Sequence, residues 1–394
     1  MEVQLKGAAA ALLGWMRNSA LPLWADAGFD REHGRFEERL TLDATPLPDV
    51  PIRLMSQARQ IYVYALATRR GWYPDAVGLL EQAYQSMRRD FSGRDRDDGW
   101  IFSIKRDGTV VDARRDLYAH AFVLLAIASY VDATGRRDAL SLADRTLAYI
   151  DHRMAAPRGG GFLDSLPPID GLRRQNPHMH MFEGLLALWD CSRDAKYLAR
   201  AAELFELFAV KFFQSDTGSL CEYFTASLDP AVGINGKRVE PGHHYEWIWL
   251  LRRFERASGR SVQAVVDALY HHANQHGYDQ DGLVVDEILA DGSHHVRSRR
   301  TWPITEGIKA NVVEAKRGRE GADRKAVLLA AALLRRFLVS EPSGGWMDRF
   351  DAKGNPSIDF MPASTFYHVA CAIDELWRFS NDGAHVRLAT RPEE

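Results

Sequence analysis

The sequence predicts an all-α fold: an (α/α)6 barrel of six helix pairs with short β-hairpins at one mouth. Two observations predict it. Glycine-rich turns followed by an aromatic or aliphatic residue recur about every 60 residues, and two helical patterns lie between successive turns. Helix pairs of this kind bury their faces only by stacking or closing. Six pairs suggest a closed ring, with an open solenoid as the alternative.

The turns define the repeats. After four of them a strand-like stretch and a hairpin signal follow, most clearly at 101–105 with the turn 106–108 and at 284–289 with the turn 290–292. Residues 351–354 and, more loosely, 169–171 fill the same slot. The six turn segments are 34–36, 99–101, 160–162, 218–220, 282–284 and 345–347.

The two helices of each pair differ in character. Helical patterns that precede a hairpin, such as 195–213 and 323–339, alternate charged with apolar residues and are expected to face solvent. Patterns that follow a hairpin, such as 117–134 and 179–192, are more apolar and are expected to form the inner ring. No Pro/Ser-rich linker or charge block interrupts the pattern, so we predict one domain over 1–380 and a tail over 381–394.

Composition excludes several classes of protein. The chain has 394 residues, 46% of them hydrophobic and 26% charged, and a formal net charge of -3, so a nucleic acid is not expected as its main partner. Apolar stretches such as 119–131 are too short to span a membrane, and the N-terminus has no signal-peptide pattern, which predicts a cytoplasmic protein. The three cysteines, Cys191, Cys221 and Cys371, are far apart, predicting buried thiols and no disulfide or CxxC zinc site.

The first turns of the predicted inner helices carry an unusual set of polar and aromatic residues. If the six helices run the same way, their starts converge on one mouth, where their dipoles and unpaired N–H groups favour an anionic intermediate. These first turns are 57–62, 116–120, 176–183, 241–247, 301–306 and 364–368.

Histidines are prominent in these turns. Asn176, His180 and Glu183 fall on one helical face, although Asn176 could instead cap its helix and His180 could be a satisfied core histidine. His243 and Glu246 are spaced i, i+3, which places a carboxylate beside an imidazole that it can orient and make more basic. The alternative for this pair is a capped helix start with a surface ion pair.

Three further turns carry candidates. His368 precedes an apolar run and is expected to lie half-buried at the rim, in a catalytic or a structural role. Arg59 precedes an apolar, aromatic run, so its buried charge requires a carboxylate partner or a ligand. Glu306 is a candidate partner or a hydroxyl acceptor, and Trp302, one turn earlier, offers a sugar ring an apolar face or simply packs.

Recurrence favours a shared pocket over separate structural roles. A polar group falls at the same relative place in every repeat, including Arg59, Tyr118, His180, His243 and His368. By contrast, the pairs His271-His272 and His294-His295 and the arginine-rich stretch 297–300 show no convergence, so we expect them on the solvated surface.

The residue types in this pocket favour proton transfer next to a carbonyl. A histidine with a pKa near neutrality can remove such a proton, while an arginine and helix N-termini hold the oxygens of the enediolate. Glycoside hydrolysis requires two acidic groups that flank a bond. Asp116, Glu183, Glu246 and Glu306 keep that alternative open.

Four ordered motifs then carry a family resemblance. RQNPHMHMFEGLLAL at 174–188, PGHHYEWIWLL at 241–251, TWPITEGIKAN at 301–311 and STFYH at 364–368 resemble the N-acylglucosamine 2-epimerase superfamily, most closely its D-mannose isomerase branch. The resemblance covers nearly the whole chain. It implies an enzyme that interconverts mannose and fructose through a cis-enediol without metal or other cofactor, acting as a monomer or homodimer.

The resemblance also implies roles for individual residues. His243 and His368 would be the acid/base pair, and Arg59, Tyr118, Asn176, His180 and Glu246 would bind the oxygens of the sugar, while Trp302 and Glu306 match a motif without a certain role. Residues 361–363 lack the aromatic platform that disaccharide-acting relatives tend to offer at the rim, which favours a monosaccharide. The alternatives are a 2-epimerase of mannose, cellobiose or N-acetylglucosamine, a glycoside hydrolase, and a sugar-binding protein without turnover.

Overall fold

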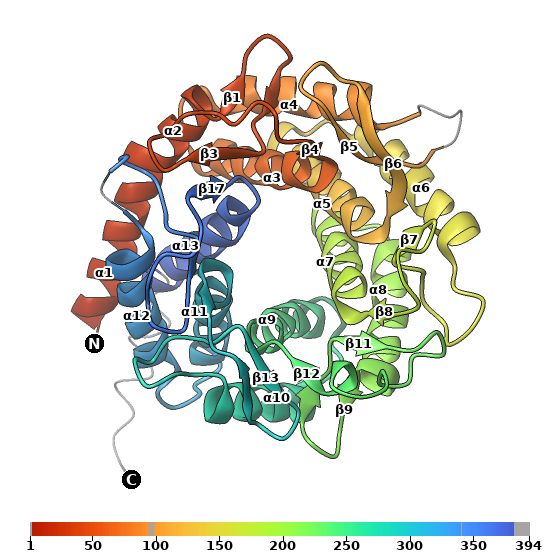
Figure 1. Ribbon diagram of the computed structural model, residues 1–394, viewed down its shortest axis with the longest axis vertical. Helices are drawn as coiled ribbons and strands as arrows, with labels where there is room; N and C mark the ends of the chain where they lie inside the picture. The colour runs from red at the N-terminus through yellow and green to blue at the C-terminus, as the bar shows by residue number, and fades with distance from the viewer. Residues whose placement is uncertain (1, 94–97, 340, 382–394) are drawn as a thin grey trace.

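The computed structural model describes residues 2–93, 98–339 and 341–381, and these form two concentric rings of helices (Figure 1). Each repeat runs from an outer helix through a hairpin region into an inner helix. The inner helices are α3 (Leu54–Arg70), α5 (Leu117–Thr134), α7 (Gln175–Ser192), α9 (Pro241–Ser258), α11 (Thr301–Lys316) and α13 (Thr365–Asn381). The predicted (α/α)6 barrel is confirmed.

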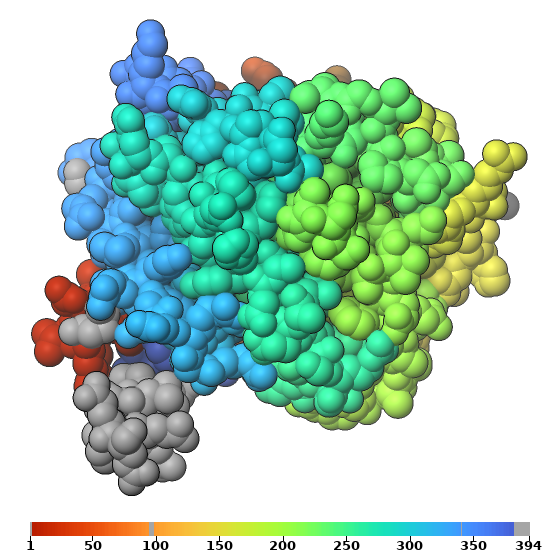
Figure 2. Space-filling model, turned by 90° about the horizontal axis from the view of Figure 1, so that it is seen from below, coloured from red at the N-terminus to blue at the C-terminus, as the bar shows by residue number. Residues whose placement is uncertain are grey.

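Outer helices often end in, or continue through, a π-helical turn. They are α1 (Glu2–Trp15) with η1 (Met16–Ala20) and α2 (Leu21–Asp26), α4 (Ala76–Phe91), η2 (Arg137–Ala139) with α6 (Leu140–Tyr149) and η3 (Ile150–Met154), α8 (Ala195–Leu207) with η4 (Phe208–Phe212), α10 (Gln263–His276), and α12 (Ala322–Ala332) with η6 (Leu333–Phe337). Viewed from the side, successive segments of the chain lie next to one another in sequence order (Figure 2).

Short strands surround the mouth at which the inner helices begin. They are β1 (Phe29–Asp30), β2 (Arg35–Phe36), β3 (Arg39–Thr41), β4 (Ile52–Arg53), β5 (Ile101–Ile104), β6 (Val110–Asp116), β7 (Ser165–Leu166), β8 (Arg173–Arg174), β9 (Phe213–Gln214), β10 (Ser219–Leu220), β11 (Tyr223–Phe224), β12 (Arg238–Val239), β13 (Glu287–Leu289), β14 (His294–Val296), β15 (Arg299–Arg300), β16 (Arg349–Phe350) and β17 (Phe360–Pro362). A 3-10 turn, η5 (Asn235–Lys237), precedes β12.

Antiparallel strand pairs join every repeat to the next one. The pairs are β4–β5, β6–β7, β8–β11, β12–β13, β15–β16 and β17–β3. The last pair places Leu40 of the first repeat opposite Met361 of the sixth. The ring is therefore closed, which excludes the open solenoid.

The apolar character of the inner helices follows from their burial on all sides. α5 packs against α3, α7 and the outer helix α6. Among the described residues it alone has the length and mean hydropathy (1.4) of a membrane span, but 72% of that window is buried inside the protein. The prediction that no apolar stretch is long enough for a span is wrong for α5, because packing between helices requires the same apolar surface.

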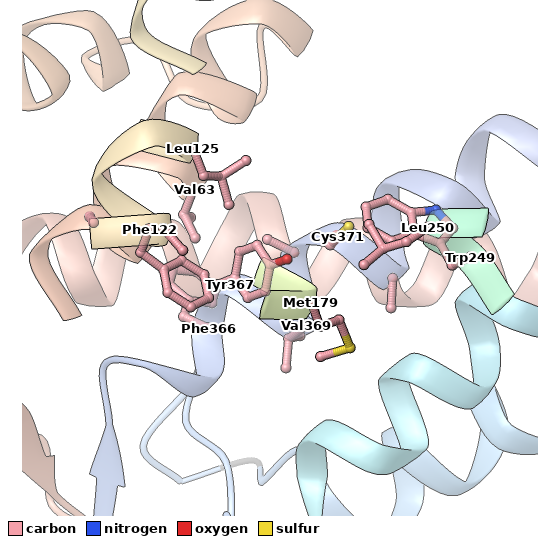
Figure 3. Close-up of a cluster of buried hydrophobic side chains, with 14 of the residues drawn as sticks. Val63, Phe122, Leu125, Met179, Trp249, Leu250, Phe366, Tyr367, Val369 and Cys371 are labelled. Carbon is pink, nitrogen blue, oxygen red and sulfur yellow. The ribbon is translucent and has the colours of Figure 1, made fainter. Parts of the chain in front are cut away.

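Apolar side chains fill the middle of the inner ring. Figure 3 shows Val63, Phe122, Met179, Leu250 and Tyr367, which come from five of the six inner helices, together in this filling. All five are buried. The barrel is therefore not a pore, and the mouth has a floor.

Some element boundaries differ from the prediction. α7 begins at Gln175, four residues before the predicted 179. The turn at 169–171 does not close a hairpin, because β7 pairs with β6 of the preceding repeat and β8 pairs with β11 of the next. The predicted tail, 381–394, lies outside the described residues except for Asn381, the last residue of α13. The single domain over 1–380 remains a prediction.

The cysteines are free thiols, as predicted. Cys221 and Cys371 are buried, whereas Cys191 is half-buried at the end of α7.

Candidate active site

A cavity of about 440 Å³ opens at the mouth of the barrel. Because all six inner helices begin there, their first turns supply much of its lining. The predicted site residues that line it are Arg59, Tyr118, Asn176, His180, His243, Glu246, Trp302 and His368. Glu306 does not line it and is fully buried.

His243 is held by a carboxylate from its own repeat's hairpin region. Its Nδ1 lies 2.9 Å from Oε1 of Glu222, in the segment between β10 and β11. Glu222 also accepts hydrogen bonds from the Glu240 backbone N–H, at 3.3 Å, and from Nε2 of Gln175, at 3.0 Å. The sequence predicted that Glu246 orients His243 and makes it more basic; the orienting partner is Glu222 instead, whereas the charge of Glu246 does raise the pKa of His243.

A recurring carboxylate could have identified Glu222. In each repeat an apolar residue after the glycine-rich turn pairs with a residue before that turn. In five of the six repeats an acidic residue stands two positions after this apolar residue. These residues are Glu38, Asp164, Glu222, Asp286 and Asp348, and Phe102 occupies the equivalent position in the second repeat. Glu38, for example, accepts a hydrogen bond from the Arg53 backbone N–H just before α3, so the position ties the hairpin region to the start of the inner helix.

His368 contacts Glu306, a residue that does not line the cavity. Its Nδ1 lies 2.7 Å from Oε1 of Glu306 on the neighbouring helix α11. The other oxygen of Glu306 lies 2.6 Å from Nζ of Lys309, and both side chains are fully buried. Glu306 therefore contacts the imidazole and not the cavity, in contrast to the predicted role in sugar binding.

Two of the three histidines in the lining, His243 and His368, hold opposite protonation states. Burial opposes the charged form of His243, but the carboxylates of Glu222, Glu240 and Glu246 outweigh it and raise the pKa of His243 to about 9. Burial and the nearby positive charges of Arg59 and Lys309 hold the pKa of His368 well below its usual value. At neutral pH His243 is therefore protonated and His368 neutral, a pattern that suits an acid and a base.

Trp302 lies between these histidines. Its ring centre is 4.9 Å from that of His243 and 5.7 Å from that of His368. A Cβ atom at Gly242 would stand 2.5 Å from the indole ring, so glycine is required there for the tryptophan to pack. The indole therefore offers an apolar face in the part of the cavity between His243 and His368.

Arg59 has no carboxylate partner among the described residues, so Glu306 is not its partner, and of the two expected alternatives a ligand remains. Its terminal nitrogens donate to the Ser364 carbonyl, at 3.1 Å, and to the Tyr118 hydroxyl, at 2.5 Å. The guanidinium carbon lies 4.2 Å from the centre of the Phe122 ring. Aromatic faces and neutral acceptors hold the charge, and Nε keeps an unused donor.

Two buried oxygen atoms at the cavity lack hydrogen-bond partners. They are Oδ1 of Asn176 and Oε1 of Glu246. Asn176 does not cap α7, since Arg174 occupies that position. Buried acceptors are normally satisfied, so these atoms are suited to hydroxyl donors of a ligand.

The helical spacing predicted that Asn176, His180 and Glu183 point into one pocket, and this is wrong for Glu183, whose carboxylate contacts His180 instead. Nδ1 of His180 lies 3.0 Å from Oε2 of Glu183. Glu183 also accepts a hydrogen bond from the Tyr367 hydroxyl, and it does not line the cavity. Asp116 caps α5 by accepting from the Ala119 N–H at 2.8 Å, so it too is structural.

Arginines that the sequence analysis assigned to the surface, or did not single out, line the rim. Arg300 contacts Glu240 at 2.7 Å and Asp286 at 2.8 Å, so part of the stretch 297–300 is an ordered ion-pair network and not a solvated loop. The other rim arginines are Arg39, Arg53 and Arg349. Arg53 and Arg300 occupy the same position of their repeats, directly before an inner helix. A search of the sequence for residues that recur at this position could have identified both.

The remaining carboxylates of the lining are already engaged. Glu38 pairs with Arg53 at 2.5 Å, Glu240 pairs with Arg300, and Asp348 accepts a hydrogen bond from Thr365. Among the described lining carboxylates, Glu246 has the oxygen that is both buried and without a hydrogen-bond partner. A glycosidase needs two carboxyl groups placed to act on one bond, and the other three are held by Arg53, Arg300 and Thr365, so the geometry does not favour hydrolysis.

Three sets of residues at the cavity have side chains of the kinds that bind metal ions, and each set contains a hydrogen bond between a histidine and a carboxylate. His180, Glu183 and Glu246 bring ligand-type atoms within 4.8 Å of one another, as do two similar sets around His243 and His368. In each set Nδ1 of the histidine is hydrogen-bonded to a carboxylate. The donors thus form a hydrogen-bonded network.

His272 differs from its prediction as a surface residue. It is buried, its ring stacks on that of His244 with centres 5.2 Å apart, and its Nε2 lies 3.3 Å from the Ala290 carbonyl. His271 and His295 are exposed, as expected.

Comparison with known proteins places this geometry in a family. The N-acylglucosamine 2-epimerase family model matches residues 34–372. A protein named mannose-6-phosphate isomerase from Rhizobium meliloti (strain 1021) is 36% identical over 392 residues, covering 95% of this chain and 98% of the relative. D-mannose isomerase from Thermobifida fusca is 30% identical over 332 residues, covering 77% of this chain and 80% of the relative.

Solved structures agree on the fold. A D-mannose isomerase superposes with a TM-score of 0.85 at 21% identity, covering 95% of this chain and 97% of the other. Cellobiose 2-epimerase from Bacillus thermoamylovorans B4167 gives a TM-score of 0.85 at 19% identity, covering 94% and 98%. The chain belongs to the N-acylglucosamine 2-epimerase family and is a sugar isomerase or epimerase.

Proposed function

We propose that this enzyme interconverts D-mannose and D-fructose by moving a proton between C2 and C1 of the open-chain sugar, through a cis-enediol and without a metal. The observation that carries the proposal is the pair of cavity histidines with opposite protonation states. The reaction requires a base for the carbon-bound proton and an acid for the carbonyl oxygen. Neutral His368 and protonated His243 meet these requirements.

Each proton has a donor and an acceptor in the proposed reaction. Nε2 of His368 removes the C2 proton of mannose as His243 donates its proton to O1, which produces the enediol. His368 then returns its proton to C1, and His243 accepts the O2 proton as the C2 carbonyl forms. Both histidines end in their starting states.

The other lining residues hold the sugar in this proposal. Arg59 and Tyr118 contact the oxygens on which charge develops, because their donors already converge at one place. The bare oxygens of Asn176 and Glu246 accept hydroxyl protons. Trp302 packs against the carbon chain between the two histidines.

An NMR experiment tests the reaction. Chelator-treated enzyme is incubated with mannose in deuterated water, with glucose, N-acetylglucosamine and cellobiose as parallel substrates. We expect fructose from mannose, deuterium at C1 where the base exchanges its proton with solvent, and a rate that the chelator leaves unchanged. Formation of glucose labelled at C2 would identify a 2-epimerase instead. If the folded enzyme formed no product, both the isomerase and the epimerase activity would be contradicted.

A phosphorylated mannose is a second candidate substrate. Arg39 and Arg349 line the rim without an ion pair to a carboxylate among the described residues, and Nε of Arg39 is buried without a hydrogen-bond partner. Guanidinium groups bind phosphate strongly. The relative from Rhizobium meliloti, named mannose-6-phosphate isomerase, points the same way.

Arginine variants separate the two substrates. If the phosphate ester is used, Arg39→Gln should lower kcat/KM for mannose 6-phosphate by about tenfold or more and leave kcat/KM for mannose nearly unchanged. Arg88→Gln, on the exposed side of α4, is the matched control. Equal effects on both sugars would assign Arg39 to a site for neutral hydroxyls.

The cytoplasmic location, the monomeric or homodimeric state, and the absence of membrane and nucleic-acid partners remain predictions.

A further inference from the structure

Lys309 is a fully buried lysine in the floor of the cavity. Its Nζ lies 2.6 Å from Oε2 of Glu306 and 3.8 Å from the centre of the Trp249 ring. Its Nζ also lies 5.9 Å from the centre of the Tyr367 ring, and Figure 3 shows Tyr367 and Trp249 among the buried apolar side chains. A buried charge is stable only with a partner, and Glu306 is the carboxylate in contact with it.

The floor holds more carboxylates than a buried site easily keeps ionised. Glu246 has an oxygen within 4.8 Å of ligand-type atoms of both Glu306 and His368, and likewise of His180 and Glu183. Burial and the charge of Glu246 raise the pKa of Glu306 well above its usual value, and the ammonium of Lys309, in contact with its Oε2, is the main influence that lowers it. The ionisation of Glu306 therefore depends on Lys309.

The state of Glu306 controls which nitrogen of His368 carries a proton. An ionised carboxylate can only accept, so with Glu306 ionised the proton of the neutral ring is on Nδ1 and Nε2 has a free lone pair. A protonated Glu306 would instead donate to Nδ1, and the ring would then carry its proton on Nε2. In that tautomer the cavity-facing nitrogen cannot remove a proton from a substrate.

We propose that Lys309 is a positioning residue that fixes the catalytic tautomer of His368 by keeping Glu306 a hydrogen-bond acceptor. The consequence for turnover rests on the proposed role of His368 as the base. Lys309 itself touches no substrate, since it lies below the cavity and does not line it.

The test combines spectroscopy with kinetics in the full-length enzyme. In Lys309→Met, the 15N shifts of the labelled His368 ring should show that the proton has moved from Nδ1 to Nε2. With mannose, kcat should fall by about 100-fold or more while KM changes little, because binding contacts are kept. Lys316→Met is the matched control, since Lys316 stands on the same helix next to Glu375 and should leave both readouts unchanged.

A double variant distinguishes this role from a structural one. Gln at position 306 accepts the Nδ1 proton through its carbonyl and never titrates, so Glu306→Gln with Lys309→Met should show the wild-type tautomer and a higher kcat than Lys309→Met. Relative to Glu306→Gln alone, the added Lys309→Met should change kcat by no more than about threefold. This comparison decides the question even if Lys309→Met alone does not fold.

Two outcomes would overturn the proposal: an unchanged His368 tautomer in folded Lys309→Met, or a large further loss of kcat when Lys309→Met is added to Glu306→Gln. The spectroscopic result needs no turnover. An enzyme that shows the tautomer change but does not act on mannose would thus contradict the proposed function and leave the role of Lys309 intact.

Discussion

His243 and His244 are neighbours in the sequence, equally enclosed by protein, and face opposite sides of α9. Nδ1 of His243 bonds to the Glu222 carboxylate, and its ring borders the cavity. His244 points toward the outer layer, where its Nε2 accepts the Leu220 N–H at 3.1 Å and its Nδ1 lies 3.4 Å from the Glu240 carbonyl. One histidine has a charged partner and the other has only backbone partners.

The same backbone arrangement recurs in two other repeats. Nε2 of His120 accepts the Trp100 N–H at 3.1 Å, and Nε2 of His178 accepts the Phe162 N–H at 3.0 Å, while each Nδ1 bonds to the carbonyl four residues earlier. These residues connect an inner helix to its hairpin region. Burial lowers the pKa of His178 to about 3, whereas carboxylates raise that of His243 to about 9. The hydrogen-bond partner of the ring, a carboxylate or only backbone groups, and not the burial, distinguishes the histidines of the proposed reaction from the structural ones.

The largest expected effect is on turnover. His368→Gln should lower kcat on mannose by about 100-fold to 10000-fold and leave the fold intact, because it removes the proposed base. His178→Leu should instead leave kcat of the folded enzyme nearly unchanged and lower the free energy of unfolding by about 1–3 kcal/mol, because the Phe162 N–H loses its acceptor. Steady-state kinetics and urea unfolding of both variants measure this. Loss of turnover in folded His178→Leu would break the distinction.

Removing the partner of His243 should change the pH profile. Glu222→Gln removes a carboxylate that raises the pKa of His243, so this pKa should fall by about 1–3 units. Since His243 acts in its protonated form in the proposed reaction, the alkaline loss of kcat/KM, expected near pH 9 in the wild type, should begin at lower pH. Glu206→Gln on the surface of α8 is the control. An unshifted alkaline limb would show that Glu222 does not tune this histidine.

The two kinds of histidine should contribute to stability with opposite dependence on pH. The folded-state pKa of His243 is raised from 6.5 to about 9, so its contribution is complete below pH 6.5 and is lost as the pH rises through 9. The folded-state pKa of His178 is lowered to about 3, so its contribution is present above pH 6.5 and is lost as the pH falls toward 3. Unfolding free energies of wild type, His243→Gln and His178→Gln across this range measure both slopes. Slopes of equal sign would contradict the assigned states.

The smallest effect is expected at the exposed histidines. His271→Ala and His295→Ala should change the free energy of unfolding by no more than about 0.5 kcal/mol and leave kcat unchanged, because neither side chain is buried. Thermal unfolding and the mannose assay measure this. A marked loss of activity in either variant would assign a role to a surface that the cavity does not include.

Periodicity predicted the inner helix starts well. The pattern at 117–134 matches α5 in full, and the first turns around Arg59, His180 and His368 do meet at one mouth. These features are local, because helical spacing and apolar character depend on residues within a few turns. Spacing also placed His180 and Glu183 on one face of a single helix, where their side chains are in contact.

Partners from other segments were not predictable in this way. Glu222 reaches His243 from 21 positions away, and Glu306 reaches His368 from a neighbouring helix 62 positions away. Such contacts exist only when the ring has closed and the helices have taken their rotations about their own axes. A one-dimensional pattern carries no information on those rotations.

The sequence by itself determined the repeat, the two helix layers and the set of polar residues at the mouth, because apolar periodicity sets which faces must be buried. The tertiary structure decided which carboxylate each histidine faces and hence which imidazole is charged. The physical reason is that a pKa depends on charges within a few ångströms and on the exclusion of water, and both come from packing between repeats.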